Sequence, residues 1–174
     1  MTEPPRPDRD RDTAGRARNA RPRDPLGRPL PRFAGDQPAA ADDPALPPAE
    51  ALTVAQQLLD TGRPFHAHEV FEAVWKAGPT PAAERDMWQG LAQIAVGLTH
   101  ALRGNSRGAA ALLRRGVDRL VGYPSPGPHD VDIEGIRQHS LTLADRIEAT
   151  GLAGVGPDAT AIRLRSDTSA PRAS

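Results

Sequence analysis

The sequence predicts an all-α fold, a compact bundle of about five helices between disordered N- and C-terminal tails. Within residues 48–151, apolar residues recur at intervals of three and four, and no segment alternates at period two. All six aromatic residues except Phe33 lie between Phe65 and Tyr123, whereas eleven of the nineteen prolines precede Ala49. The capacity to bury surface is therefore concentrated in the middle of the chain, and we expect one core.

Both ends of the chain have compositions typical of disorder. Residues 1–47 are rich in proline and arginine, and residues 1–35 hold nine arginines against five acidic residues. Residues 152–174 return to Gly, Ser, Thr, Asp and Arg without periodicity. Such segments bury too little apolar surface to offset the entropy lost on ordering. We therefore expect a disordered arm at 1–47, a helical domain at 48–151 and a disordered tail at 152–174.

Proline and glycine delimit the first two helices. Proline is tolerated in the first turn of a helix, so helix one begins near Pro48, and Gly62 ends it. Helix two runs from Pro64 to Ala77, where a Gly-Pro pair follows. The interval between the two helices is therefore very short.

The remaining helices follow the same rules. Thr80 is a candidate N-cap for helix three, which runs to about Leu102. A Gly-Asn pair separates helix three from helix four, at about residues 106–121, and a proline-rich loop precedes helix five, at about residues 130–149. Because the connections are short, consecutive helices are expected to be antiparallel neighbours.

The composition excludes several kinds of site. Without cysteine, the chain has no disulfide framework, thiol nucleophile, iron–sulfur cluster or cysteine-based zinc site. No phosphate loop or nucleophile elbow is present, and we expect no cofactor and no bound metal. The N-terminus lacks the apolar run of a signal peptide, and no stretch is long and apolar enough for a membrane span. We therefore expect a cytoplasmic protein with no membrane partner.

Helices two and three each carry polar residues at the edge of an apolar face. On helix two, His68 and Glu72 lie one turn apart beside Trp75, at the border of the core. On helix three, a narrow polar stripe consists of Gln89, Gln93 and His100. The pairs Glu72–Gln89 and His68–Gln93 have equal index sums, as contacts between antiparallel helices require. We therefore expect His68, Glu72, Gln89 and Gln93 to form one polar cluster, edged by Trp75.

Two glycines on helix three, Gly90 and Gly97, lie beside this stripe. Because glycine has no side chain, these positions would let another helix approach closely. The short turn between helices two and three makes helix two the expected neighbour.

The polar cluster has three interpretations. A hydrogen-bonded network between the helices would fix their register, because polar groups at such an interface are costly unless they are paired or solvated. An open cluster would bind a small polar or acidic ligand, or a segment of a partner protein, beside Trp75, since amides and histidine suit hydrogen-bond recognition. Catalysis is the least favoured of the three. The sequence thus predicts a non-catalytic helical binding or interaction module.

At these residues the chain resembles domain of unknown function family 309, whose members are small all-helical proteins. The resemblance covers about Ala51 to Tyr123. It rests on the H-x-x-x-E-x-x-W pattern at residues 68–75, the segment Trp-Gln-Gly-Leu-Ala-Gln at 88–93 and the segment Gly-Asn-Ser-Arg-Gly-Ala at 104–109. It implies a helical bundle and no defined activity. It also implies that the residues characteristic of the family are His68, Glu72, Trp75, Gln89 and Asn105.

A metal-dependent hydrolase is one alternative. His68 and Glu72 have the spacing of two metal ligands on one helical turn, but the zinc protease pattern requires a second histidine where Glu72 stands. A third ligand would be needed, and His100 is the nearest candidate in sequence.

An adaptor for RNA or an acidic partner is the other alternative. The expected outer face of helix four carries four arginines, Arg107, Arg114, Arg115 and Arg119. Nucleic acid is the disfavoured partner, because the chain has no net charge and the domain lacks an array of exposed aromatic residues for base stacking.

Overall fold

In the computed structural model, the described residues are 23–30, 45–76, 80–153, 155–156 and 161–166. The chain divides into two units, residues 1–24 with 28–44 and residues 25–27 with 45–174. In the first unit, Arg28 N donates a hydrogen bond of 2.7 Å to Asp24 Oδ1. Residues 1–22 and 31–44 of the predicted N-terminal arm lie outside the described residues.

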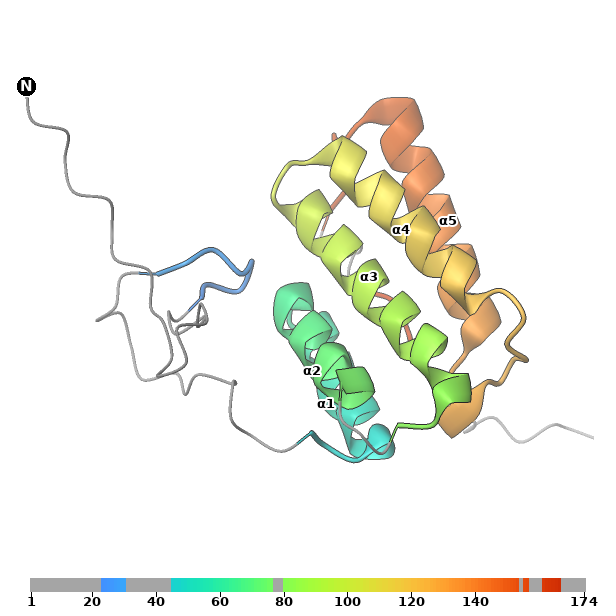
Figure 1. The fold of residues 1–174 in the computed structure, drawn as a ribbon. Helices are drawn as coiled ribbons and strands as arrows, with labels where there is room; N and C mark the ends of the chain where they lie inside the picture. The colour runs from blue at the N-terminus through green and yellow to red at the C-terminus, as the bar shows by residue number, and fades with distance from the viewer. Residues whose placement is uncertain (1–22, 31–44, 77–79, 154, 157–160, 167–174) are drawn as a thin grey trace, which may run out of the picture. The chain divides into compact units, whose positions relative to one another are not determined.

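The described part of the second unit contains five α-helices in the predicted order (Figure 1). They are α1 (Pro48–Asp60), α2 (Pro64–Lys76), α3 (Arg85–Leu102), α4 (Ser106–Leu120) and α5 (Ile133–Thr150). Short 3₁₀ turns precede α3 and α5, at Ala82–Glu84 and Pro128–Asp130. The predicted all-α class is therefore confirmed.

Side-chain caps determine where α4 and α5 begin. Asn105 Oδ1 accepts a hydrogen bond of 2.9 Å from Gly108 N, and Asp132 Oδ1 accepts one of 3.0 Å from Gly135 N. The predicted cap at Thr80 is wrong. Its hydroxyl donates to a carbonyl near the end of α2, and a 3₁₀ turn separates Thr80 from α3. Thr80 therefore secures the end of α2.

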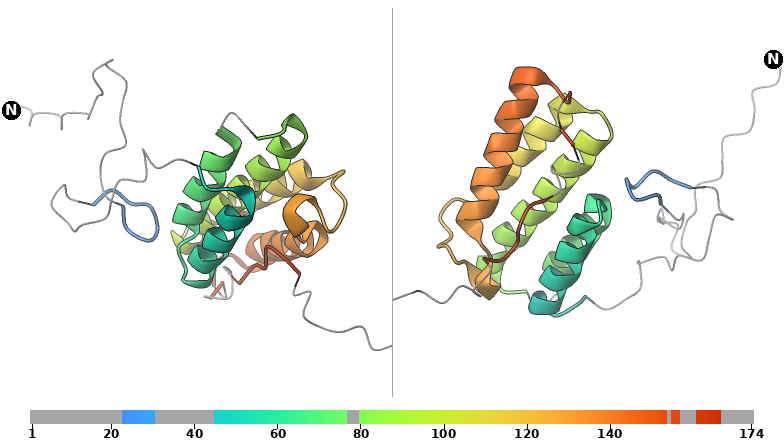
Figure 2. Two further views of the ribbon diagram at one scale, coloured as in Figure 1. Left: turned by 90° about the horizontal axis from the view of Figure 1, so that it is seen from below. Right: turned by 180° about the vertical axis from the view of Figure 1, so that it is seen from behind.

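Helix α3 lies in the middle of the bundle. It contacts α2 on one side and α4 on the other, while α1 packs against α2 and α5 packs against α4 (Figures 1 and 2). The two hairpins on either side of α3 are antiparallel, as the short connections predict. Helices α1 and α5 thus stand at opposite ends of the series.

Glycines bring α3 and α4 close together. A Cβ at Gly116 would lie 2.8 Å from the Gly90 carbonyl oxygen and 2.6 Å from Ile94 Cγ1. A Cβ at Gly97 would lie 2.9 Å from Leu113 Cγ. Gly90 and Gly97 are therefore sites of close helix approach, as predicted. The expected neighbour was wrong, because both glycines face α4 and not α2.

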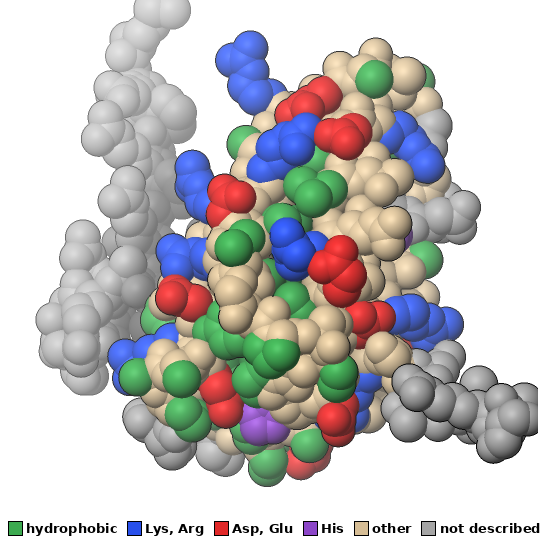
Figure 3. Space-filling model, turned by 90° about the vertical axis from the view of Figure 1, so that its right-hand side faces the viewer, with side chains coloured by type: hydrophobic (Ala, Val, Ile, Leu, Met, Phe, Trp, Pro, Cys, Tyr) green, Lys and Arg blue, Asp and Glu red, His purple; other side chains and the backbone are tan. Residues whose placement is uncertain are grey.

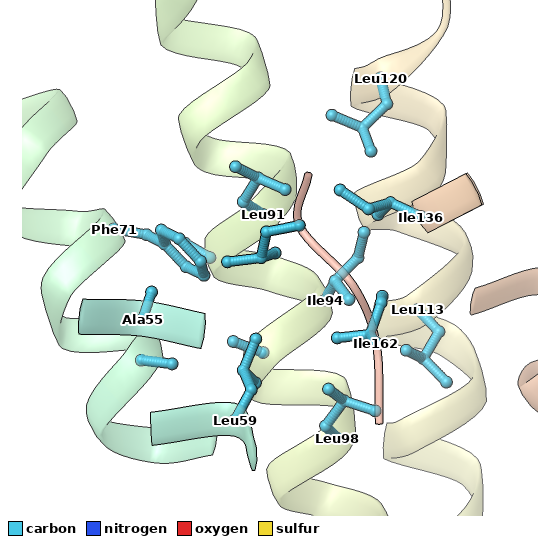
Figure 4. Close-up of a cluster of buried hydrophobic side chains, with 14 of the residues drawn as sticks. Ala55, Leu59, Phe71, Leu91, Ile94, Leu98, Leu113, Leu120, Ile136 and Ile162 are labelled. Atoms are coloured by element: carbon cyan, nitrogen blue, oxygen red, sulfur yellow. The ribbon is translucent and has the colours of Figure 1, made fainter. Parts of the chain in front are cut away.

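Side chains from all five helices meet in one core (Figure 4). Trp88 and Phe71 are its largest members, 0% and 1% exposed, and their rings lie 6.2 Å apart. The aliphatic residues labelled in Figure 4 include Ala55, Leu59, Leu91, Ile94, Leu113 and Ile136. The core thus spans the whole width of the bundle.

Residues 161–166, named here the C-terminal strap, correct the prediction of a disordered tail. Ile162 and Leu164 are only 2% and 3% exposed, and Figure 4 shows Ile162 among the helical side chains. The prediction failed because two apolar residues in a short polar stretch give no helical period. Residues 154, 157–160 and 167–174 of the predicted tail lie outside the described residues.

The bundle surface carries charges of both signs. Arg114 Nη2 lies 2.6 Å from Asp145 Oδ1 and 2.6 Å from Glu148 Oε2, and Arg119 Nη1 lies 2.9 Å from Asp86 Oδ1. Figure 3 shows acidic and basic side chains side by side on one face of the molecule. None of the described helices is long and apolar enough to cross a membrane.

Candidate functional site

A cavity of about 270 Å³ lies between α2 and α3 and is open to solvent on one side. Its lining comprises His68, Glu72 and Trp75 from α2, Gln89, Ala92, Gln93 and Val96 from α3, and Leu112 from α4. Four polar side chains therefore surround the same space as an indole ring and three aliphatic side chains. Five of the seven residues expected at the site border this cavity.

Helix α2 places its three residues on one face, because they are separated by four and three positions. The Glu72 carboxylate has two neighbours. Its Oε2 lies 3.7 Å from His68 Nε2, and its Oε1 lies 2.7 Å from Lys76 Nζ. Lys76 Nζ also lies 5.7 Å from the centre of the Trp75 ring. Lys76, which is exposed, therefore lies beside both Glu72 and Trp75.

His68 is an uncharged group at neutral pH. Burial lowers the pKa of His68 below its ordinary value, and the Lys76 charge acts in the same direction. The Glu72 carboxylate and the Ala92 carbonyl oppose this change but do not overcome it. The imidazole thus offers one donor and one acceptor to the cavity.

The lowered pKa of His68 predicts an acid-sensitive fold. As the pH falls below about 6.5, the ordinary pKa of histidine, the unfolded chain takes up a proton that folded His68 resists. The unfolding free energy should therefore decrease with falling pH in this range and stay level above it. Urea unfolding between about pH 5 and pH 8 measures the slope. The slope should be shallower in His68→Gln, and an equal slope in both chains would contradict the prediction.

Helix α3 contributes two amides four residues apart. Gln93 Oε1 is buried and has no hydrogen-bond partner among the described residues. The His68 imidazole, in contrast, pairs with the Ala92 carbonyl. A buried polar atom without a partner costs about 1–3 kcal/mol. The cavity is therefore bordered by a buried amide oxygen whose hydrogen bond is not made within the described part of the chain.

The other two expected residues lie elsewhere, at the corner between α3 and α4. Asn105 Nδ2 is 2.7 Å from His100 Nδ1, and Asn105 Oδ1 caps α4. His100 does continue the polar stripe of α3, but it lies two turns beyond Gln93, a rise of about 10 Å along the helix. His100 and Asn105 therefore form a separate pair that fixes the turn into α4.

The aliphatic part of the lining was missed by the sequence analysis. Ala92 and Val96 lie on the same helix as the glutamines, one turn apart, and could have been found from that spacing. Leu112 comes from α4 and is adjacent to Leu113, which faces the core. Nothing in the sequence indicates that α4 reaches this cavity, because that contact depends on how closely α3 and α4 pack.

The lining restricts the chemistry that the cavity can perform. It contains no hydroxyl or thiol side chain and so offers no serine, threonine or cysteine nucleophile. Within the described ranges, no group of three or more His, Cys, Asp or Glu side chains could hold a metal ion. His68 and Glu72 provide two ligands, and the third candidate, His100, lies outside the cavity. The arrangement is suited to hydrogen-bonded recognition.

A second polar cluster joins the loop before α5 to the start of α3. His129 Nε2 lies 2.9 Å from Glu84 Oε2, and Trp88 Nε1 donates to the same oxygen over 3.4 Å. Tyr123 Oη donates a hydrogen bond of 2.6 Å to the Ala83 carbonyl. None of these residues was expected at a site, because His129 and Glu84 are 45 positions apart in the sequence. Their contacts hold the loop in place.

Comparison with known proteins identifies one family. The family model described as Domain of unknown function (DUF309) matches residues 52–112. No curated protein and no solved structure matches the chain. The matched range runs from α1 into α4 and includes all seven expected site residues, but it ends before Tyr123, to which the resemblance in the sequence extends. The expected resemblance to this family is therefore confirmed over residues 52–112, and the family description assigns no activity.

Proposed function

We propose that the domain is a non-catalytic binding module whose ligand occupies the cavity between α2 and α3. The observation that carries this proposal is Gln93 Oε1, a buried polar atom at the cavity without a hydrogen-bond partner among the described residues. A ligand that donates to this oxygen recovers a hydrogen bond that is otherwise lost. A closed structural network would instead satisfy its own polar atoms and fill the space between the helices.

The ligand in this proposal is a small, uncharged polar molecule with one flat apolar face. The amides of Gln89 and Gln93 both donate and accept hydrogen bonds, and Trp75 provides a flat apolar surface. An acidic ligand is disfavoured by the carboxylate of Glu72. A cation gains little, because Lys76 already pairs with that carboxylate at 2.7 Å.

Benzamide and benzoate are suitable matched probes, because they share a ring and differ in an amide against a carboxylate. The chain has two tryptophans, and their indole N–H signals in an NMR spectrum report on the cavity (Trp75) and on the core (Trp88). We expect benzamide to shift the Trp75 signal in a saturable way and to leave the Trp88 signal in place. Benzoate should shift neither signal.

Two glutamine variants test whether the response comes from the cavity. Gln93→Leu should abolish the benzamide shift, whereas Gln138→Leu, at an exposed position of α5, should leave it unchanged. A shift that persists in Gln93→Leu, or an equal response to benzoate, would overturn the proposal. A lack of response to both probes in the unaltered chain would favour the structural network.

The adaptor for RNA or an acidic partner has less support. Two of the four arginines expected to form a basic face on α4 are engaged in ion pairs, Arg114 with α5 and Arg119 with α3. Neighbouring charges of opposite sign cancel the field that would attract a phosphate backbone. The mixed charges on the face in Figure 3 agree with this interpretation.

A further inference from the structure

The C-terminal strap is held in the way that a bound peptide is held. Gln56 of α1 contacts its backbone twice: Nε2 donates to the Ile162 carbonyl over 3.0 Å, and Oε1 accepts from Leu164 N over 2.8 Å. The Leu164 carbonyl also accepts a hydrogen bond of 2.9 Å from Asp132 N, the N-cap residue of α5. Three main-chain groups of the strap are therefore hydrogen-bonded to α1 and to the start of α5, as in peptides that bind by main-chain hydrogen bonds. Figure 2 shows the strap, in dark red, between α1 and α5.

Alternate side chains of the strap fill an apolar groove. Ile162 and Leu164 are buried, whereas Arg163 between them is exposed and lies 3.9 Å from Asp60. The groove is lined by residues of α1, α2, α3 and α5, among them Leu59, Phe71, Ile94 and Ile136. The space left unfilled is only about 10 Å³, which is the size of a single water site at most. The groove thus fits one isoleucine and one leucine, two positions apart.

We propose that this groove is a peptide-binding site for an extended Ile-x-Leu segment, and that the strap of a second copy of the chain occupies it by exchange. The close fit selects the occupant, because a second copy carries the same two side chains at the same spacing. Recognition by Gln56 involves backbone atoms alone, so it does not depend on which chain provides the strap. Ten residues, 151–160, connect α5 to the strap, and three of them are glycine. Such a connection permits exchange.

The protein concentration determines the balance between the single chain, whose groove holds its own strap, and the dimer with exchanged straps. Because only ten residues separate α5 from the strap, a chain's own strap has an effective concentration of about the millimolar range, so the closed single chain predominates in dilute solution. Exchange between two copies conserves every contact of the strap and groove. Weakening the strap of one chain should therefore leave a groove that accepts a strap added in trans.

A labelled peptide tests whether the groove binds an extended segment. The receptor is the full chain carrying Ile162→Asp and Leu164→Asp, and the probe is a fluorescent peptide with the sequence of residues 160–167. Fluorescence anisotropy should show saturable binding to this variant. Binding to the unaltered chain should be weaker by a factor of about ten or more, because the strap of that chain competes with the peptide. A peptide with the same two aspartates is the matched control and should not bind. Adding Gln56→Ala to the receptor should weaken binding.

A second measurement tests whether the occupant is another copy. In sedimentation equilibrium, the unaltered chain should form dimers as its concentration approaches about 1 mM, whereas the double aspartate variant should remain monomeric. Absence of peptide binding to the helical variant would overturn the peptide site. Peptide binding without dimers of the unaltered chain would overturn the second copy as its occupant. If circular dichroism shows that the double variant is not helical, Leu164→Ala replaces it and the same outcomes decide.

Discussion

Replacing Trp88 with alanine is expected to lower the unfolding free energy by about 3–5 kcal/mol. Trp88 is 0% exposed, and its ring lies 6.2 Å from that of Phe71, so truncation leaves a large space in the centre of the core. The change also removes the indole donor that lies 3.4 Å from Glu84 Oε2. Urea unfolding followed by far-ultraviolet circular dichroism measures the loss without relying on tryptophan fluorescence.

Trp75 is the matched control for this experiment. It is only partly buried and borders the cavity between α2 and α3, so Trp75→Ala should cost clearly less stability. The same variant should lose the response to benzamide. A loss of stability as large as that of Trp88→Ala would mean that Trp75 is a core residue, and it would favour a structural role for the whole cluster.

Replacing Gly116 with valine is expected to lower the unfolding free energy by about 3 kcal/mol. A Cβ at this position would lie 2.8 Å from the Gly90 carbonyl oxygen, and a backbone atom cannot move aside as a flexible side chain can. The same Cβ would lie 2.6 Å from Ile94 Cγ1. Helices α3 and α4 would have to separate, which loosens the centre of the bundle. Chemical unfolding compared with the unaltered chain gives the magnitude.

Gly116→Ala is a sharper test, because helix propensity and the contact with α3 then change the unfolding free energy in opposite directions. Helix propensity alone predicts that alanine raises the stability by about 1 kcal/mol, whereas the contact with Gly90 predicts a net loss. Ala111→Val, at an exposed position of the same helix, controls for the β-branched side chain and should have a small effect. A gain in stability for Gly116→Ala would show that α3 and α4 are not in close contact at this point.

Local patterns in the sequence were sufficient for the helices and for much of the candidate site. Proline at the first turn and glycine after the last turn delimit α1 and α2, and these features act within a few residues. The polar cluster could be anticipated because a helix fixes which residues share a face, and a short turn fixes which residues of two antiparallel helices are opposite. His68, Glu72, Gln89 and Gln93 follow from these two rules alone.

Other features depend on contacts between distant segments, for which a single sequence carries no periodic signal. Gly90 and Gly97 predict that another helix packs closely against α3, but only the tertiary structure shows that this helix is α4. Leu112 reaches the cavity for the same reason. His100 does not belong to the cluster, because it lies two turns beyond Gln93 along the axis of α3.

The helix at residues 64–76 and its neighbour at 85–102 were thus specified by the sequence itself, since hydrophobic periodicity and turn residues act locally. The strap was decided only by the tertiary structure. Its two buried side chains and its hydrogen bonds to Gln56 and Asp132 exist because α1 and α5 leave a groove between them. An isolated extended segment cannot form these contacts, because they are made with distant parts of the chain. The composition of the segment alone is therefore typical of a disordered tail.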